Sequence, residues 1–499
     1  MKRHCLTTYL TLLVIGLLCH SCRTTEREAI TPEANPNPWA DDYTLVSAMV
    51  DYRQWGSYNV HDPACIKVGD TFYVYSTDAI YREDKDVAAA AGVPLGYIQV
   101  RKSNDLVNWE FVGWALPKIP QEAMQHVRSN ALRGEGATNI WAPYVVKHGE
   151  KYRLYYCVSA FAQSVSYMGL AESDSPEGPW ELKGCVVKTD ASSEMNAIDP
   201  SIAVTAEGEH WMVYGSYFGG LFALQLDPET GLALREGDQG HLIARRANGA
   251  KDNIEAPEVI YNPEFNQYYL FVSYDPLMTT YNVRVGRSDS PAGPYYDMFG
   301  NDMRKETNNY PILTHPYRFA NHPGWAGVAH CGVVNDGGRF FMMHQGRLSP
   351  GNQMMDLHVR ELFWTAEGWP VASPERYAAI PNETFVEADF AGEWEIILIR
   401  ESAYERGLYA GQILWGEGEL QADEVNVSQL YTFTTSGEVT GEQSGHWKYA
   451  DGRLALRLGD DYYGELIPHM GQDWENEQKT ILFTGLDKQG YSLWGKRVK

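Results

Sequence analysis

Apolar and polar residues alternate with a period of two along most of this chain, in short runs separated by Gly, Asp and Asn turns. Such alternation predicts β-strands that bury one face and leave the other in contact with solvent. No long stretch has apolar residues spaced three and four apart, so no long helix competes with this interpretation. The pattern therefore predicts an all-β protein.

A strand–turn–strand unit recurs five times. The copies are VHDPACIKVGDTFYVYST from residue 60, IWAPYVVKHGEKYRLYYCVS from 140, AIDPSIAVTAEGEHWMVYGS from 197, IEAPEVIYNPEFNQYYLFVS from 254 and GVAHCGVVNDGGRFFMMHQG from 327. The first four share a proline before the first strand, and the fifth lacks it. A sheet of three or four antiparallel strands cannot bury both faces alone, and radial stacking of such sheets solves this. The repeats therefore predict a five-bladed β-propeller.

Three carboxylates stand at the starts of repeats: Asp62, Asp199 and Glu255. The first strand of each propeller blade lines the central axis, so these side chains are expected to meet at one end of it. An Asp-Pro pair is also an ordinary turn signal. A role in turns alone would explain one carboxylate at a repeat start more easily than three. Glu255 stands one place before the Asp position of the other repeats, so simple alternation points it elsewhere unless its strand begins irregularly.

Clustered carboxylates suit glycoside hydrolysis, which needs one carboxylic acid and one carboxylate on opposite sides of the scissile bond. Like charges held close raise one another's pKa, so a third carboxylate can keep the acid protonated near neutral pH. A calcium site is the competing use of such a cluster. Trp141 and Phe218 stand where the wall of a sugar-binding funnel is expected, although packing between blades is their other interpretation.

The charge balance excludes one class of partner. The formal net charge is −24, and nucleic-acid or anionic-membrane surfaces need basic patches. A neutral sugar remains compatible with this balance.

The N-terminus has the pattern of an export signal. Lys2 and Arg3 precede the apolar run LTLLVIGLL at 10–18, which is too short to span a membrane. Residues 1–22 resemble a bacterial lipoprotein signal with Cys22 as the lipidated residue, and an ordinary secretory signal is the alternative. Residues 23–42 are polar and proline-bearing, as in a tether. We expect an exported protein of the cell envelope, at the outer membrane or in the periplasm, that contacts a membrane only through a lipid anchor.

The motifs together resemble a known family. The segments NVHDPACIKVGDTFYVYSTDA, NIWAPYVVKHGEKYRLYYCVSAF, NAIDPSIAV, IEAPEV and DLHVRELFWTAEGWPVASPERY look like glycoside hydrolase family 43. They look closest to its endo-acting α-1,5-L-arabinanases with an extra C-terminal β domain, over about residues 43–380. The resemblance implies a five-bladed propeller, an inverting mechanism, and plant cell-wall arabinan or arabino-oligosaccharides as substrate.

The resemblance also implies roles for single residues. Asp62 would be the general base and Glu255 the general acid, while Asp199 would raise the pKa of the acid and orient it. His330 of GVAHCGVV would bind a calcium ion on the axis, with waters completing the shell; a hydrogen-bonded core histidine is the alternative. Arg347 would donate to substrate hydroxyls, and an ion pair that closes a blade is an equal alternative for it.

The sequence departs from the family pattern at three places. Tyr144 replaces a commoner Asp, Glu258 replaces an aromatic residue, and GVAHCG replaces a more usual Gly-Pro-Gly-His. These changes keep the three carboxylates but affect what is expected of the substrate-binding walls.

Two domains follow from these patterns: a catalytic propeller over 43–385 and a smaller, barrel-like β domain over 386–499 that binds glycan or serves structure alone. The inserts 81–96 and 117–139 could wall off part of the substrate site. Exo-acting α-L-arabinofuranosidase or β-xylosidase activity on the same scaffold is the nearest alternative function. A glycan-binding propeller without catalysis is a remoter one.

Overall fold

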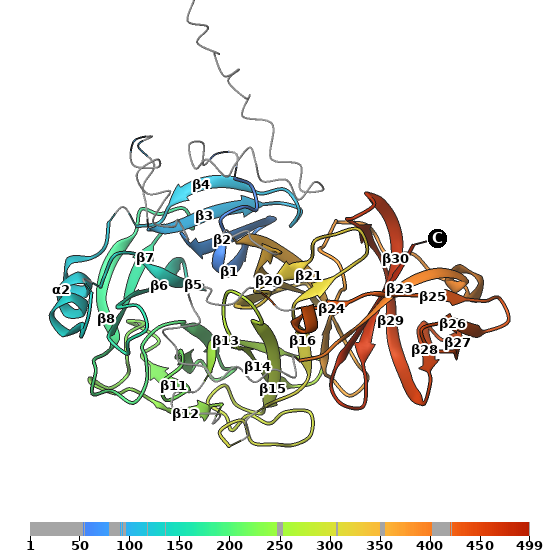
Figure 1. The fold of residues 1–499 in the computed structure, drawn as a ribbon. Coiled ribbons are helices and arrows are strands. Elements are labelled where there is room, and N and C mark those ends of the chain that lie inside the picture. The colour runs from blue at the N-terminus through green and yellow to red at the C-terminus, as the bar shows by residue number, and fades with distance from the viewer. Residues whose placement is uncertain are drawn as a thin grey trace, which may run out of the picture. The chain divides into compact units, whose positions relative to one another are not determined.

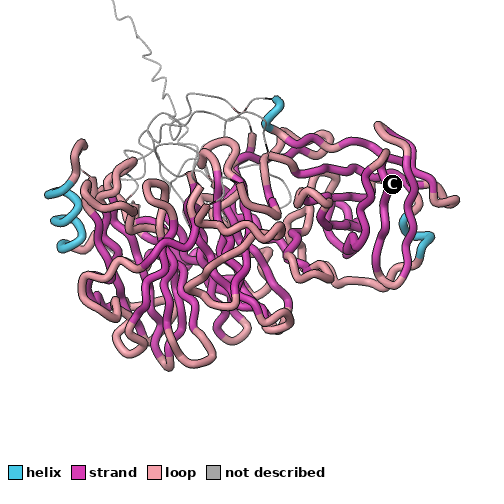
Figure 2. The backbone as a smooth tube through the Cα atoms, turned by 90° about the horizontal axis from the view of Figure 1, so that it is seen from below, coloured by secondary structure: helices cyan, strands magenta, loops and turns pink. Residues whose placement is uncertain are grey.

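The computed structural model describes residues 53–498 apart from 54, 79–89, 91, 93–95, 117, 135, 247–252, 306–307, 350–354, 402–419 and 421. The predicted signal segment with Cys22, the tether 23–42 and most of the insert 81–96 lie outside the described residues. Across the described part, strands dominate and helices are short (Figure 2). None of the helices found there has the length and apolar character needed to cross a bilayer.

Four separate sheets each contain four antiparallel strands in chain order (Figure 1). They are β1 (His61–Val68), β2 (Thr71–Thr77), β3 (Ile98–Ser103) and β4 (Glu110–Trp114); β5 (Trp141–His148), β6 (Lys151–Ser159), β7 (Ser166–Ser173) and β8 (Glu181–Thr189); β9 (Ser201–Val204), β10 (His210–Tyr214), β11 (Leu221–Leu226) and β12 (His241–Ala244); and β13 (Ile254–Asn262), β14 (Gln267–Tyr274), β15 (Asn282–Ser288) and β16 (Ile312–Thr314). These sheets are the blades expected from the first four repeats.

The fifth repeat does not form a separate blade. Its strands β19 (Cys331–Asp336), β20 (Arg339–Leu348), β21 (Asp356–Trp364) and β22 (Pro370–Ala372) belong to a seven-stranded sheet with β17 (Tyr317–Arg318), β18 (Trp325–Ala326) and β24 (Asn426–Val427). The cause is the length of β20, which runs past β19 and pairs its last residues with β18. The prediction of five separate blades is therefore wrong for the last repeat, and the arrangement is propeller-like with four separate blades.

The first strands of the repeats meet at a common axis. β1 contacts β5 and β19, β13 contacts β9 and β19, and β5 contacts β9, so the five inner strands close a ring. Figure 1 shows β1, β5 and β13 near the centre of this arrangement. The starts of distant repeats are thereby brought together.

Apolar clusters fill the spaces between neighbouring sheets. One cluster joins Tyr75 and Val100 of the first blade to Leu154 of the second, and another joins Val213 of the third blade to Val272 of the fourth. Burial of both faces between neighbours provides the hydrophobic stabilisation that a lone sheet lacks.

The insert 117–139 contains the helix α2 (Gln121–Asn130), which packs against β6 and β7 of the second blade. Its buried residues are Ala123 and Val127, four positions apart and so on one helical face. Glu122 in the first turn and Arg128 in the last turn complement the helix dipole.

The C-terminal residues form a closed eight-stranded barrel, as the sequence predicts in outline. Its strands are β23 (Gly392–Ile399), β25 (Gln429–Phe433), β26 (Glu438–Gly441), β27 (Gly445–Ala450), β28 (Arg453–Leu458), β29 (Asp461–Asp473), β30 (Gln478–Leu486) and β31 (Ser492–Arg497), with short 3₁₀ turns at Glu387–Phe390 and Ala422–Glu424. Pairing of β31 with β23 closes the barrel and leaves no free edge.

Two features join the barrel to the propeller. β24 pairs in parallel with β17 and so extends the seven-stranded sheet. The ammonium of Lys496, on β31, is fully buried 3.0 Å from Glu375 Oε1 and 2.9 Å from Asp473 Oδ1, and it also contacts Glu475. Buried charges require such compensation, so the carboxylate of Glu375, which follows β22, depends on a residue of the barrel.

Candidate active site

A left-handed residue marks the start of every inner strand. The five equivalent positions are Asp62, Ala142, Asp199, Ala256 and His330, with φ of 50°, 40°, 59°, 52° and 51°. Non-glycine residues rarely adopt this conformation, and they persist in it where the surrounding structure fixes them. In β1, β5 and β13 a shift in pairing register accompanies the residue, as at a β-bulge.

This backbone feature explains the offset of Glu255. The left-handed position of its repeat is Ala256, so Glu255 precedes it just as His61 precedes Asp62. The register shift between Glu255 and Glu258 breaks the simple alternation of the strand. The irregular start that the sequence required is therefore present.

Asp62 is held by groups from its own repeat and from the fifth repeat. Its Oδ2 accepts a hydrogen bond from the Thr77 hydroxyl at 2.7 Å, and its backbone N–H donates to Gln345 Oε1 at 3.0 Å. Its Oδ1 lies 2.8 Å from Nδ1 of His330. The Thr77 oxygen also accepts from the N–H of Ala142 at 2.8 Å, which links the starts of β1 and β5.

Glu255 and Asp199 are held by neighbouring repeats in the same way. Glu255 Oε2 accepts from the Ser216 hydroxyl at 2.7 Å, and Oε1 accepts from the Tyr281 hydroxyl at 2.8 Å. Asp199 Oδ2 accepts from the N–H of Ala256 at 3.1 Å, so it lies against the residue that follows Glu255. The three predicted carboxylates are thus brought to one end of the axis.

The surroundings of the three carboxyl groups shift their pKa values in opposite directions. Burial by itself would raise the pKa of Asp62, but the charge of His330 and the contacts of His61 and Thr77 hold it well below its usual range. Burial raises the pKa of Asp199 well above its usual range and also raises the pKa of Glu255; the charge of Asp62 adds to both increases. The cluster therefore combines an ionised Asp62 with protonated character on the Asp199–Glu255 pair.

His330, the predicted calcium ligand, lies in this cluster. Burial lowers its pKa, but the charges of Asp62, Asp199 and Glu255 outweigh this and raise it to about 9. His61 lies 3.6 Å from Asp62, and burial lowers the pKa of its imidazole to about 4.

The three predicted substrate-binding residues lie in different surroundings. Trp141 is half-buried at the start of β5 and packs edge-on against the ring of Phe161, which is 40% exposed. Phe218 is half-buried in the turn that follows Ser216. Arg347 is buried on β20, where its charge lowers the pKa of His61, so it lies close to the carboxylate cluster rather than on the outer surface.

Glu258 and Tyr144, the departures from the family pattern, belong to a layer below the carboxylates. Glu258 is buried; its Oε2 accepts from the Ser201 hydroxyl at 2.9 Å, and its Oε1 accepts from the N–H of Val333 at 3.1 Å. Burial raises the pKa of Glu258 to about 8. Its charge raises the pKa of Tyr144, after the larger effect of burial. Both residues therefore serve the packing of inner strands.

Sequence reasoning missed the hydroxyls that orient the acids. Thr77, Ser216 and Ser273 lie at or near the end of the second strand of their repeats, in VYST, VYGS and LFVS. Ser273 accepts from the backbone N–H of His330 at 2.9 Å, which completes the pattern. A Ser or Thr that recurs at the end of the first four repeats was the available signal. Tyr281 had no such signal, because it lies in a loop outside the repeats.

The insert around α2 lines a cavity of about 420 Å³. Its lining includes His126 of α2, Lys188, Asp190 and Gln239, and none of the three carboxylates borders it. Among the described residues of the insert, His126 is the one in this lining, so the expected role of the insert at the substrate site stays a prediction.

Two family models match the chain. One described as glycosyl hydrolases family 43 matches residues 56–370, and one described as a C-terminal lipocalin-like domain matches residues 374–495. Together they cover the propeller-like part and the barrel.

Individual relatives extend over both parts. The chain is 29% identical to an extracellular endo-α-(1→5)-L-arabinanase of Thermotoga petrophila, over 92% of this chain and 97% of the relative. A crystal structure of endo-1,5-α-L-arabinanase from Thermotoga petrophila superposes with a TM-score of 0.72 at 29% identity, over 89% of this chain and 99% of the other. An extracellular exo-α-(1→5)-L-arabinofuranosidase of Cellvibrio japonicus is also 29% identical, over 62% of this chain and 86% of the relative.

Proposed function

The chain belongs to family 43 of the glycosyl hydrolases, and we propose that it cleaves α-1,5-L-arabinofuranosyl linkages inside arabinan chains. The endo-acting relative of Thermotoga petrophila matches it over both the propeller-like part and the barrel. We assign residues 43–385 to the catalytic domain and 386–499 to the accessory domain. The substrate would be plant cell-wall arabinan or arabino-oligosaccharides, which are neutral and so compatible with the acidic chain.

The mechanism we propose is inverting. Asp62 takes a proton from a water molecule, which attacks the anomeric carbon while Glu255 gives its proton to the leaving glycosidic oxygen. The bond to that oxygen breaks as the bond to water forms, and Glu255 ends as the carboxylate. Asp199, against the backbone of Ala256, keeps the proton on Glu255 before reaction and fixes its direction.

One observation carries this proposal: contacts between repeats bring Asp62, Asp199 and Glu255 to one end of the axis, where their surroundings also shift the pKa values of Asp62 and Glu255 in opposite directions. A pair of carboxyl groups whose environments separate their pKa values is what general acid and base catalysis requires. Trp141, Phe218 and Arg347 are proposed to contact the sugar.

Substitution of the carboxylates tests the assigned roles. Glu255→Gln and Asp62→Asn are each expected to lower kcat by roughly 100- to 10,000-fold on linear arabinan, because acid and base are each worth that much. Asp199→Asn is expected to lower activity less and to move the high-pH limb of kcat/KM to lower pH. The carboxyl groups of Asp199 and Glu255 oppose each other's ionisation, so removal of the Asp199 carboxyl lowers the pKa of Glu255 and the reactive proton is lost earlier as pH rises.

Circular dichroism and melting curves show whether each variant is folded. Wild-type rates in Glu255→Gln or Asp62→Asn would contradict the assignment.

The products distinguish endo from exo action. Debranched arabinan is expected to yield a range of oligosaccharides at the earliest times, measured by size separation of the digest. Arabinose as the sole early product would instead support the exo-acting alternative, which the relative from Cellvibrio japonicus favours.

A calcium ion fits at His330. Nδ1 of His330 lies against Asp62 Oδ1, and histidines that bind metals commonly present their second nitrogen to a carboxylate in this way. Nε2 would then hold the ion in place of the proton that the neighbouring carboxylates otherwise keep on His330, with waters as the other ligands. When bound, its charge would stabilise the ionised axial carboxylate. Elsewhere in the described residues, the metal-type cluster Glu375, Asp473 and Glu475 surrounds the ammonium of Lys496 instead.

Chelation tests the calcium proposal. Removal of divalent ions is expected to lower both the melting temperature and the rate of wild-type protein, and added Ca²⁺ is expected to restore both. His330→Ala is expected to reproduce the loss and to show no further response to chelator. If the chelator changes neither the melting temperature nor the rate of the wild-type protein, the calcium proposal is wrong.

The proposed location is the cell envelope, with a lipid on Cys22. The relatives from Thermotoga petrophila and Cellvibrio japonicus are named extracellular, which supports export. The apolar run that ends in LLCHSC supports the anchor. Cys22→Ala is expected to move the protein from the membrane fraction to the soluble fraction on fractionation of producing cells. Unchanged membrane association would contradict the anchor.

A further inference from the structure

A short loop, residues 275–281, connects β14 to β15 and ends on Tyr281, the residue that donates a hydrogen bond to Glu255. The N–H groups of Thr279 and Tyr281 both donate to the carbonyl of Pro276 at 3.1 Å, and the N–H of Gly327 donates to the carbonyl of Thr279 at 3.0 Å. The loop is therefore fixed by its own turn and by the neighbouring repeat. Its position determines where the Tyr281 hydroxyl points.

Asn282 holds both ends of this loop together. Its Nδ2 donates to Asp275 Oδ2 at 2.7 Å and to the carbonyl of Thr280 at 2.9 Å. Its Oδ1 accepts from Nε of Arg284 at 2.7 Å, and the side chain of Asn282 is fully buried. Because an amide has one accepting and one donating end, the contact with Arg284 fixes which end faces the loop.

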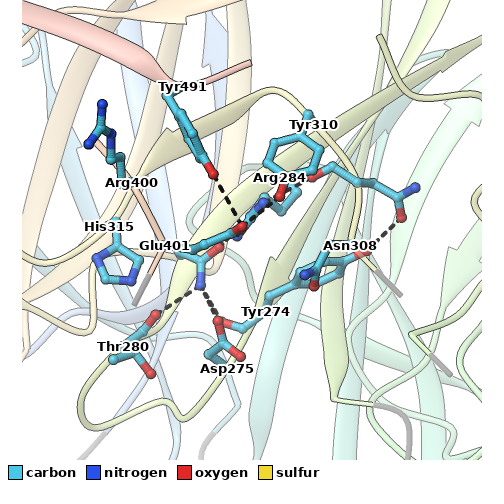
Figure 3. A network of polar contacts seen from close by, with 12 residues as sticks. Tyr274, Asp275, Thr280, Arg284, Asn308, Tyr310, His315, Arg400, Glu401 and Tyr491 are labelled. Carbon is cyan, nitrogen blue, oxygen red and sulfur yellow. Dashed lines mark hydrogen bonds and ion pairs between the residues drawn. The ribbon is translucent and has the colours of Figure 1, made fainter. Parts of the chain in front are cut away.

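Arg284 is in turn paired with the C-terminal domain (Figure 3). Its side chain is fully buried, and Nη2 donates to Oε2 of Glu401 at 2.7 Å. The other oxygen of Glu401 accepts from the hydroxyl of Tyr310 at 2.6 Å and from that of Tyr491 at 3.4 Å. A buried guanidinium without a carboxylate partner is strongly unfavourable, so Glu401 fixes the place of Arg284.

The contacts thus run without interruption from the C-terminal domain to the cluster: Glu401, Arg284, Asn282, the 275–281 loop, Tyr281 and Glu255. A second branch leaves Asp275 for the guanidinium of Arg246, whose Nε donates to Asn308 Oδ1 at 3.1 Å. Arg246 also lies over the ring of Tyr274, 4.5 Å from its centroid, which ties the start of the loop to the end of β14.

We propose that Glu401 is a positioning residue for the reaction, and that the C-terminal domain acts through Arg284, Asn282 and Tyr281 to orient the carboxyl group of Glu255. The proposal rests on the role assigned above to Glu255. It gives the domain a part in catalysis that needs no glycan-binding surface of its own.

The proposal has a measurable consequence because the Tyr281 hydroxyl favours the ionised form of Glu255. Loss or misplacement of this donor raises the pKa of Glu255, so the high-pH limb of kcat/KM moves to higher pH. The other groups that face Glu255 are Ser216, Tyr217, Asp62, Asp199 and His330, and none of them is changed by a substitution at residue 401.

The test compares Glu401→Gln, Tyr281→Phe and the double variant in the full-length protein, with debranched arabino-oligosaccharides as substrate. Tyr281→Phe is expected to lower kcat about tenfold and to shift the limb upward by about one pH unit, since a hydrogen bond to a charged group is worth roughly that much. Glu401→Gln is expected to shift the limb in the same direction by less, with KM unchanged. The double variant is expected to match Tyr281→Phe alone, because both act through one contact.

Glu395→Gln is the matched control. Glu395 lies on β23 of the same barrel, and its Oε2 accepts from the N–H of Ala320 at 2.8 Å and from the Ser428 hydroxyl at 2.7 Å. Neither of these two partners belongs to the 275–281 loop. This variant is expected to keep the wild-type pH profile even if its melting temperature falls.

Carbon-13 NMR titration of the Glu255 carboxyl gives a readout that needs no turnover, so the proposal is tested even if arabinan is not the substrate. A wild-type titration curve and pH profile in Glu401→Gln, with only a lower melting temperature, would show that the residue is merely structural. Additive shifts in the double variant would also overturn the proposal. Should Glu401→Gln fail to fold, Tyr310→Phe removes one donor to Glu401 and is expected to give a smaller shift of the same sign; no shift would refute the route.

Discussion

The contact between His330 and Asp62 is the interaction on which the site depends. Three carboxyl groups are gathered out of bulk water at one end of a ring of strands, and repulsion among them opposes that arrangement. The imidazole 2.8 Å from Asp62 offsets this repulsion at a single carboxyl group. Asp62 thereby stays ionised while its neighbours hold protons more tightly, so the proposed roles of base and acid would follow from the uneven placement of one positive charge.

The backbone makes this gathering possible. The five left-handed residues give every inner strand the same backbone conformation where it begins, at one end of the axis. Two of them carry the carboxylates Asp62 and Asp199, and His330 occupies the same place in the last repeat. A cluster of carboxylates on such a frame needs only side-chain changes at these positions or, as for Glu255, at the residue before, while the surrounding strand pairing is retained.

Much of this was predictable from the repeats, because residues at equivalent places in a repeated unit must face equivalent directions. Asp62, Asp199 and Glu255 were found that way, and the offset of Glu255 signalled the irregular strand start before the structure showed it. The inclusion of the last repeat in a larger sheet was not predictable, since it depends on β20 being longer than β19 and pairing with β18. The roles of Tyr281 and Glu401 also could not be predicted, because both residues lie outside the repeats. Tyr281 contacts Glu255, and Glu401 is connected to it through other residues, only in the folded structure.

The buried ammonium of Lys496 and the pairing of β24 with β17 bear on how far the barrel and the propeller-like part depend on each other. A domain that shares a sheet and a buried ion pair with its neighbour is joined to it by more than the connecting chain. Loss of the barrel would leave the carboxylate of Glu375 without its counter-ion. It would also expose unpaired backbone N–H and C=O groups on β17. In this chain the barrel therefore supplies a counter-ion and strand-pairing groups that the propeller-like part does not supply for itself.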